Sequence, residues 1–362
     1  MEQIMDKLFY IGTYTVGTRS RGIYSMLIGD DGKLDGLATE TNKTVANPSY
    51  LAVSGNNLYA VEEIDERDGG EECGHLVSFS IGSDGELEEI GRTELKGTSY
   101  CHVKILPDNM ISASSYGSSG ISLCPIRDDR TAGTAFARTG YSGSGPNAER
   151  QEAAHTHASF VDPSGRWLLV CDLGLDRIFL YSLEDIKAAR FSDGAMLKER
   201  NIIEAPAGSG PRHLCFNHDG TRFYVAAELL SELLTYSFDS ENGSAELLSK
   251  VSTLPEDFKD DNLAADVHLS ESGNFLYVSN RGHNSIAVFD IDGKINPELL
   301  EISRIDVLGP RSFAVVGKYI IVAGQYSSNV VTYALAEHSG CIREKLSDVS
   351  VPTPVCICVK ND

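Results

Sequence analysis

RHLCFNHDGTRFYVAAELLSELLTYSF, from Arg212 to Phe238, consists of an apolar run, a turn of small and polar residues, a second run containing Tyr-Val, and a third run. The same unit recurs as DVHLSESGNFLYVSNRGHNSIAVFDI, from Asp266 to Ile291. Alternation of polar and apolar residues in LTYSFD favours β-strands, and the Asp-Gly and Ser-Gly pairs favour tight hairpins. Each unit is therefore expected to form an antiparallel sheet.

Looser copies of this unit run through the whole chain. They begin at Pro48, His102, His157 and Arg311, and their Tyr-Val equivalents lie 44 to 58 residues apart. This period is typical of one four-stranded propeller blade. Because one repeat organises all 362 residues, we expect an all-β fold with a single β-propeller domain over residues 1–362. The main helical pattern is a short one over Leu183–Arg190.

The two ends of the chain look like halves of one unit. PTPVCICV, from Pro352 to Val359, resembles a first strand with no second strand after it. LFYIGTYT, from Leu8 to Thr15, resembles a second strand with no first strand before it. We therefore expect the C-terminal strand to pair with the N-terminal strand in one shared blade, which leaves no open sheet edge and makes seven blades.

Composition limits the partners. The formal net charge is -21, so the chain should repel nucleic acid and anionic membrane surfaces. Residues 1–15 lack the pattern of a signal peptide, and no apolar run approaches the ~18 residues that span a bilayer. We expect no nucleic-acid partner, no membrane association and a cytoplasmic location.

Eight cysteines are present, and Cys171, Cys215, Cys356 and Cys358 lie in strand-like apolar runs. Thiols there usually serve as small hydrophobic side chains, so we expect reduced cysteines. Cys356 and Cys358 share one face of a strand, but no second pair with ligand spacing accompanies them. The sequence therefore predicts no zinc site at that pair.

Equivalent positions in successive blades form rings around a propeller channel, and two rings can be identified. Just past the second strands lie Tyr14, Glu63, Tyr116, Leu173, Glu228, Arg281 and Gln325, with Asp172 and Asn280 one residue earlier. Near the start of the first strands lie Cys101, His157, Arg212 and Arg311. First strands begin and second strands end at the same face, so both rings are expected to meet at one mouth.

Basic side chains gather in these rings despite the acidic composition. Arginine offers forked donors that match carboxylate or phosphate, so a small anionic substrate is expected. The alternative is that the arginines and glutamates pair to tie blades together. His155 and His157 share one strand face and suit acid/base chemistry or metal ligation, or they hydrogen-bond to neighbouring loops.

The motifs HTH (His155–His157), DLGLD (Asp172–Asp176), GSGPRH (Gly208–His213), AAEL (Ala226–Leu229) and SNRG (Ser279–Gly282) occur in an order that resembles the seven-bladed propeller lactonase family. That family includes propeller-type bacterial 6-phosphogluconolactonases and a fungal carboxy-muconate cyclase. The resemblance covers nearly the whole chain. It implies a pocket of a histidine, two arginines and a glutamate, which correspond here to His155 or His157, Arg212, Arg281 and Glu228.

This chain departs from the family pattern at the pocket rim. Ser115 stands where family members commonly have asparagine, and Tyr100 stands where a proline commonly precedes Cys-His. The segment Arg127–Glu152 is a long loop rich in Gly, Ser and Arg. These departures bear on the identity of the substrate rather than on the fold.

The leading hypothesis is hydrolysis of a sugar lactone, 6-phospho-D-glucono-1,5-lactone, to 6-phosphogluconate in the oxidative pentose phosphate pathway. We predict Glu228, His155, His157, Arg212 and Arg281 as catalytic residues, with Glu228 or a histidine as general base. The residues predicted to contact substrate are Arg311, Glu63, Asp172, Tyr116 and Gln325.

Other functions compete with this hypothesis. Glu63, Glu228, Asp172 and the two histidines could ligate a divalent ion, but interleaved arginines would oppose a cation, so we predict no metal or other cofactor. The sequence has no Gly-x-Ser-x-Gly nucleophile motif. The alternatives are a lactonising cycloisomerase that acts on a carboxylated muconate and a non-catalytic propeller that binds an anion or a protein.

Overall fold

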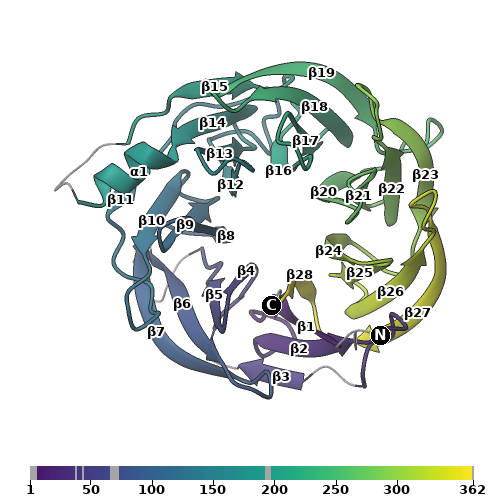
Figure 1. The fold of residues 1–362 in the computed structure, drawn as a ribbon, viewed down its shortest axis with the longest axis horizontal. Coiled ribbons are helices and arrows are strands. Elements are labelled where there is room, and N and C mark those ends of the chain that lie inside the picture. Colours follow the sequence, from purple (N-terminus) through teal and green to yellow (C-terminus); the bar gives the residue numbers. More distant parts are fainter. Residues whose placement is uncertain (1–5, 37–38, 43–44, 66–72, 192–196, 361–362) are drawn as a thin grey trace. The chain divides into compact units, whose positions relative to one another are not determined.

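The computed structural model describes residues 6–36, 39–42, 45–65, 73–191 and 197–360. Within these ranges the chain forms seven four-stranded antiparallel sheets, the blades of a β-propeller (Figure 1). The prediction of an all-β, seven-bladed fold is confirmed.

Two compact units make up the chain. The first comprises Met1–Ala60, Phe79–Glu89 and Thr253–Asp362. It contains three complete sheets, and the first consists, in strand order, of β28 (Pro354–Val359), β1 (Lys7–Thr13), β2 (Ile23–Ile28) and β3 (Thr39–Asn42). The second consists of β20 (Leu263–Leu269), β21 (Phe275–Arg281), β22 (Ser285–Asp290) and β23 (Glu298–Arg304). The third consists of β24 (Pro310–Val316), β25 (Tyr319–Gly324), β26 (Asn329–Leu335) and β27 (Ile342–Ser350).

The second unit comprises Val61–Ser78 and Ile90–Ser252. Its three complete sheets are β8 (Tyr100–Leu106), β9 (Met110–Ser115), β10 (Ile121–Pro125) and β11 (Ala137–Arg138); β12 (Thr156–Val161), β13 (Trp167–Asp172), β14 (Arg177–Ser182) and β15 (Asn201–Glu204); and β16 (Pro211–Phe216), β17 (Arg222–Ala227), β18 (Glu232–Asp239) and β19 (Ser244–Ser252). The seventh sheet consists of β4 (Leu51–Ser54), β5 (Asn57–Val61), β6 (Cys73–Ile81) and β7 (Leu87–Lys96).

The two ends of the chain share one sheet, as the sequence predicts. β28 pairs antiparallel with β1, with Ile357 opposite Ile11 and Val359 opposite Phe9 (Figure 1). Phe9 and Ile11 are fully buried in the cluster that this sheet builds with β25 and β26. The pairing therefore covers both the backbone edge and the apolar side chains of β1.

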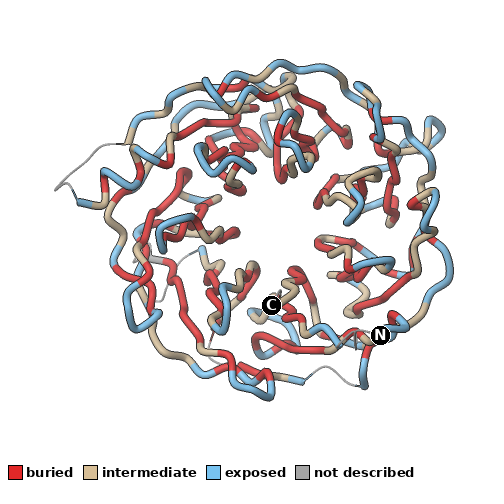
Figure 2. Tube along the Cα trace, in the orientation of Figure 1, coloured by how far each residue is buried: buried red, intermediate tan, exposed pale blue. Residues whose placement is uncertain are grey.

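Sheets pack against each other through strands that are buried on both faces. In β13, Leu169 and Cys171 pack toward the β16–β19 sheet, whereas Leu168 and Val170 pack toward the β8–β11 sheet. This arrangement explains why WLLVCD is almost continuously apolar, since both strand faces meet a neighbour. Fourth strands such as β19 are largely exposed, a gradient that Figure 2 shows along the trace.

Tight turns join first and second strands at the small residues that the sequence marks. Gly165, Gly220 and Gly273 occupy equivalent turns with φ of 70°, 70° and 75°. In each turn the glycine N–H donates to the carbonyl three residues earlier. Glycine tolerates this left-handed backbone without a Cβ clash. The turn residues therefore set hairpins of nearly constant shape.

A one-residue bulge interrupts the pairing of first and second strands in several blades. Opposite Asp172 and Cys171 on β13 lie Thr156 and Ala158, so His157 is left out of the pairing. Arg212 is left out in the same way between Pro211 and His213. Cys101, Arg311 and Val355 are bulge residues of the same kind, and the pairing of β20 with β21 shifts between Ala264 and Val267. A bulge re-aims its extra side chain, which separates these residues from the alternation that builds the core.

One α-helix lies among the described residues, α1 (Leu183–Ala189), which confirms the helical pattern in the sequence. The side chain of Ser182 caps it by accepting a hydrogen bond from the backbone N–H of Asp185. No helix in the described part of the chain has the length and apolarity needed to cross a membrane.

Deleting residues 352–362 should remove β28 and leave the edge of β1 unpaired. We expect aggregation, or a fall in the thermal midpoint of about 10 °C or more. A control that lacks only residues 361 and 362 keeps β28 and should melt like the full chain. Equal melting of the long truncation and the full chain, followed by differential scanning fluorimetry, would contradict the closure by β28.

Candidate active site

The carboxylate of Glu228 lies at the centre of a polar cluster in the second unit. Glu228 directly follows β17 and its side chain is 3% exposed. Its Oε2 lies 3.0 Å from Nε of Arg212, the bulge residue of β16, and its Oε1 accepts a hydrogen bond of 2.7 Å from Nη2 of Arg150. Each carboxylate oxygen therefore contacts a guanidinium group, and both groups stabilise the ionised form.

Arg150 comes from the loop before β12 rather than from a strand. Desolvation lowers its pKa, but the charge of Glu228 and hydrogen bonds with Tyr116 and Glu228 raise it by more, so Arg150 stays a cation. Its side chain is 35% exposed, compared with 3% for Arg212. Among the arginines of this cluster, Arg150 is thus the one that faces solvent.

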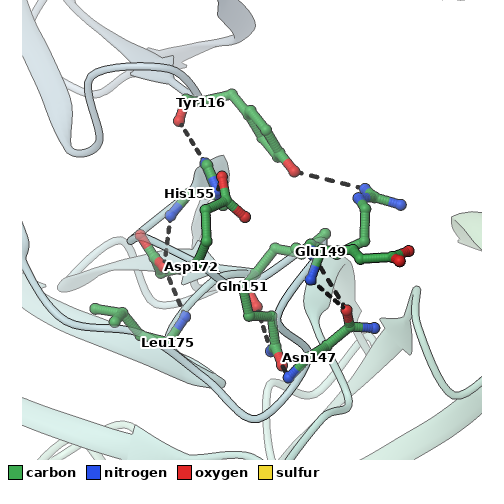
Figure 3. Close-up of polar contacts among 10 residues, drawn as sticks. Tyr116, Asn147, Glu149, Gln151, His155, Asp172 and Leu175 are labelled. Atoms are coloured by element: carbon green, nitrogen blue, oxygen red, sulfur yellow. Dashed lines mark hydrogen bonds and ion pairs between the residues drawn. The ribbon is translucent and has the colours of Figure 1, made fainter.

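Hydrogen bonds of two amide side chains, the buried Gln151 and the half-buried Asn147, hold the Arg150 loop in place (Figure 3). The side chain of Gln151 donates to the carbonyl of Leu173 and to Oδ1 of Asp176, both at 2.8 Å. The side-chain oxygen of Asn147 accepts from the backbone N–H of Glu149 and of Arg150. The loop backbone is therefore fixed against the β13–β14 turn while the side chain of Arg150 extends from it.

Tyr116 and His155 stack beside this cluster. Their ring centroids are 4.3 Å apart with an angle of 13° between planes, and the Tyr116 hydroxyl lies 3.5 Å from Nη2 of Arg150. Nδ1 of His155 contacts the Tyr116 carbonyl at 3.1 Å, and Nε2 contacts Oε1 of Glu152 at 3.0 Å (Figure 3). Both contacting groups, the Tyr116 carbonyl and the Glu152 carboxylate, are hydrogen-bond acceptors, and together they fix the orientation of the His155 ring.

The pKa values of the Tyr116 phenol and the Glu152 carboxyl group reflect these contacts. Burial raises the pKa of Tyr116, although its hydrogen bond with Arg150 lowers it. A backbone hydrogen bond lowers the pKa of Glu152, and the contact with His155 adds to this effect. Tyr116 is thus held as the neutral phenol and Glu152 as the carboxylate beside the imidazole.

Asp172 holds the backbone around His155. It is fully buried, and its carboxylate accepts hydrogen bonds from the backbone N–H of His155 and of Leu175 at 3.0 Å each and from the Thr156 hydroxyl at 2.7 Å (Figure 3). Burial raises the pKa of Asp172, and these hydrogen bonds partly offset the effect. This environment suits a positioning residue better than the substrate contact predicted from the sequence.

His157 also contacts Tyr116, and its ring begins a row of buried rings. Its ring meets Tyr116 edge-on at 6.1 Å and His213 at 5.2 Å, and His213 in turn meets His102 at 5.6 Å. The carbonyl of His157 lies 3.2 Å from Sγ of Cys101. The ring positions Cys101, His157 and Arg212 therefore gather in this unit, as the strand alignment predicts.

The remaining predicted residues divide between the units. Glu63 follows β5 in the second unit and is half-buried. Arg281, Arg311 and Gln325 belong to the first unit. There, Nη2 of Arg281 donates to the carbonyl of Ala264 at 3.3 Å, and the guanidinium of Arg311 lies 5.4 Å from the centroid of the Tyr14 ring. That these residues contribute to one site with Glu228 stays a prediction.

Arg150 is a member of the cluster that the sequence analysis did not single out. The strand alignment selects only residues at equivalent positions in blades, and Arg150 lies in the segment Arg127–Glu152, where the structure also places the short strand β11. The signal that could have found it is an arginine just ahead of the HTH motif in a loop already assigned to the pocket rim.

The predictions about cysteines and metal ligands can be compared with the described residues. Cys101, Cys124, Cys171, Cys215, Cys341, Cys356 and Cys358 are free thiols. Within the described ranges, no group of three or more His, Cys, Asp or Glu side chains is arranged to hold a metal ion.

Comparison with known proteins gives the family. The model for the family "Lactonase, 7-bladed beta-propeller" matches residues 8–359. The 6-phosphogluconolactonase of Bacillus subtilis (strain 168) is 31% identical over 359 residues, which cover 96% of this chain and 97% of the relative.

Solved structures of related proteins are similar to this chain over nearly its whole length. The crystal structure of a protein from Lactobacillus plantarum is 29% identical with a TM-score of 0.88 and covers 99% of this chain and 100% of its own. The periplasmic gluconolactonase of Pseudomonas aeruginosa is 26% identical with a TM-score of 0.87, and the match covers 98% of each chain. This chain is therefore a lactone hydrolase that belongs to the seven-bladed β-propeller lactonase family.

Proposed function

We propose that the protein hydrolyses 6-phospho-D-glucono-1,5-lactone to 6-phosphogluconate, a step of the oxidative pentose phosphate pathway. The observation that carries this proposal is the buried Glu228 carboxylate between two guanidinium groups, with Tyr116 and His155 beside it. The name of the Bacillus subtilis relative supports the choice of substrate. The cytoplasmic location stays a prediction, because one solved relative is described as periplasmic.

The reaction needs a base, an oxyanion partner and an acid. Glu228 takes a proton from water as the water oxygen attacks the lactone carbonyl, and Arg212 stabilises the oxyanion of the tetrahedral intermediate. When the bond from carbonyl carbon to ring oxygen breaks, the proton that Glu228 took from water passes to the departing ring oxygen. Glu228 thus acts first as base and then as acid, and the Arg212 guanidinium stabilises the negative charge that develops on the carbonyl oxygen. His155 keeps the catalytic role that the sequence predicts. Arg281 and His157 keep the site roles that the family resemblance implies.

The Glu228→Gln variant should lower kcat by about 100-fold or more and change KM little, because the amide keeps the size of the side chain and removes the base. The measurement is hydrolysis of 6-phosphogluconolactone at near-neutral pH, with the uncatalysed rate subtracted. Glu204→Gln, a change at an exposed carboxylate on β15 that pairs with Arg177, is the control and should leave kcat unchanged. Wild-type turnover no faster than the background would refute the lactonase proposal.

Arg212 also supports the fold, so its variants must be assayed for stability. Removing one partner of a buried ion pair leaves an uncompensated charge, and Arg212→Met should cost about 3 kcal/mol in the free energy of unfolding. The double variant with Glu228→Gln should cost less than the sum of the single changes, with a coupling of about 1 to 3 kcal/mol in urea unfolding. Additive losses below about 1 kcal/mol each would mean that the pair does not support the fold.

Prolonged dialysis against a chelator should leave kcat/KM unchanged. The guanidinium groups of Arg150 and Arg212 flank both oxygens of Glu228 and would repel a divalent cation there. Activity that disappears on dialysis and returns with a single divalent ion would show that the chemistry depends on a metal.

A further inference from the structure

The carboxylate of Glu228 is covered by protein groups in this structure. Its side chain is 3% exposed, and both carboxylate oxygens contact guanidinium groups. A general base must meet the water that it deprotonates, and two flanking cations make a carboxylate a weak proton acceptor. Glu228 therefore needs a rearrangement before it can act as the proposed base.

Arg150 is the partner that can move. Arg212 is as buried as Glu228, whereas the Arg150 side chain is 35% exposed. Among the described residues, both polar contacts of the Arg150 side chain, to Tyr116 and to Glu228, use Nη2. Its Nη1 and Nε donors are left for a ligand, and together they form the fork that fits two oxygens of a phosphate or carboxylate.

The loop fixes where this fork lies. Gln151 is fully buried and anchors the loop on Leu173 and Asp176, and its Oε1 accepts from the backbone N–H of Asn147 at 3.1 Å. Since the backbone on the C-terminal side of Arg150 is held, the motion needed to release Glu228 is confined to the Arg150 side chain. An arginine side chain changes rotamer without a change in the fold.

We propose that Arg150 is the receptor for the anionic group of the substrate, and that binding of this group draws the guanidinium away from Glu228 and thereby exposes and activates the base. This inference rests on the proposed lactonase function and adds the source of its specificity. An anion on Arg150 competes with Glu228 for the same cation, so the loss of that contact makes Glu228 a stronger proton acceptor. A neutral lactone cannot compete and meets a covered base.

The consequence is that removal of Arg150 should lower kcat/KM for the phosphorylated lactone without lowering it for the neutral one. In Arg150→Ala, kcat/KM for 6-phosphogluconolactone should fall roughly 10- to 100-fold, as expected for a lost charge-assisted hydrogen bond. For plain gluconolactone, kcat/KM should stay equal or rise, because nothing then covers Glu228. An arginine that only supported the fold would lower both values together, so the ratio between substrates identifies the role.

A second measurement tests whether the anion acts on Glu228 when it is not attached to the sugar. Inorganic phosphate added to the wild-type protein should occupy Arg150 and accelerate the enzymatic hydrolysis of plain gluconolactone, measured above the rate in phosphate without protein. The same addition should have no effect on Arg150→Ala. Phosphate that leaves the wild-type rate unchanged, or that accelerates both proteins equally, would overturn the proposed coupling to Glu228.

The control is Arg177→Ala, which removes an arginine of similar exposure that pairs with Glu204 on the surface. It should leave the substrate ratio and the phosphate effect as in the wild type. Should Arg150→Ala fold poorly by thermal melting, Arg150→Lys keeps the charge without the fork and should shift the substrate ratio in the same direction by a smaller amount.

The outcomes distinguish the two proposals. A wild-type protein that hydrolyses neither lactone refutes the proposed function itself. A wild-type protein that hydrolyses both, with an unchanged substrate ratio in Arg150→Ala, refutes the role of Arg150 alone. Binding adds a readout independent of turnover: 6-phosphogluconate should raise the thermal midpoint of the wild type more than gluconate does, and this difference should vanish in Arg150→Ala.

Discussion

The bulge at the start of the first strands is the constraint on which the candidate site depends. In a regular strand of this fold, alternate side chains point to two sheet faces, and both faces are buried against neighbouring sheets. A histidine or arginine at such a position would place a polar group in an apolar core. Because His157 and Arg212 are bulge residues, they are excluded from the alternation. The two bulge side chains are thereby separated from the paired positions, although the paired positions His102 of β8 and His213 of β16 also carry buried rings.

Burying the charged groups of the polar cluster costs free energy, which packing of the apolar core must offset. Taking Glu228 and Arg212 out of water is expensive, and their mutual attraction compensates only while both remain. The Arg150 guanidinium adds a second positive charge to the same carboxylate from a more exposed position. A net charge of -21 disfavours polyanions at long range, whereas the local excess of guanidinium groups favours a small anion. The acidic composition and the basic cluster are therefore compatible.

Much of this could be predicted from the sequence because the repeat gives positions as well as fold. Aligning second strands on the Tyr-Val phrase selected Tyr116 and Glu228, and aligning first strands on their turns selected Arg212. These three residues lie together in the second unit. The role of Asp172 could not be predicted, since an aspartate at a strand end looks the same whether it faces a ligand or, as here, backbone N–H groups. Arg150 could not be predicted for a different reason. It lies in a loop, and loop residues have no equivalent positions in other blades from which the repeat could locate them.

In the proposed site, the ion pair of Glu228 and Arg150 yields to the anionic group of the substrate. A crystal structure of the protein with bound 6-phosphogluconate, the product of the proposed reaction, tests it most directly. We expect phosphate oxygens on Nη1 and Nε of Arg150, and a separation of Arg150 Nη2 from Glu228 Oε1 well beyond the 2.7 Å of the structure described above. A complex with the phosphate bound elsewhere and this ion pair intact would contradict it.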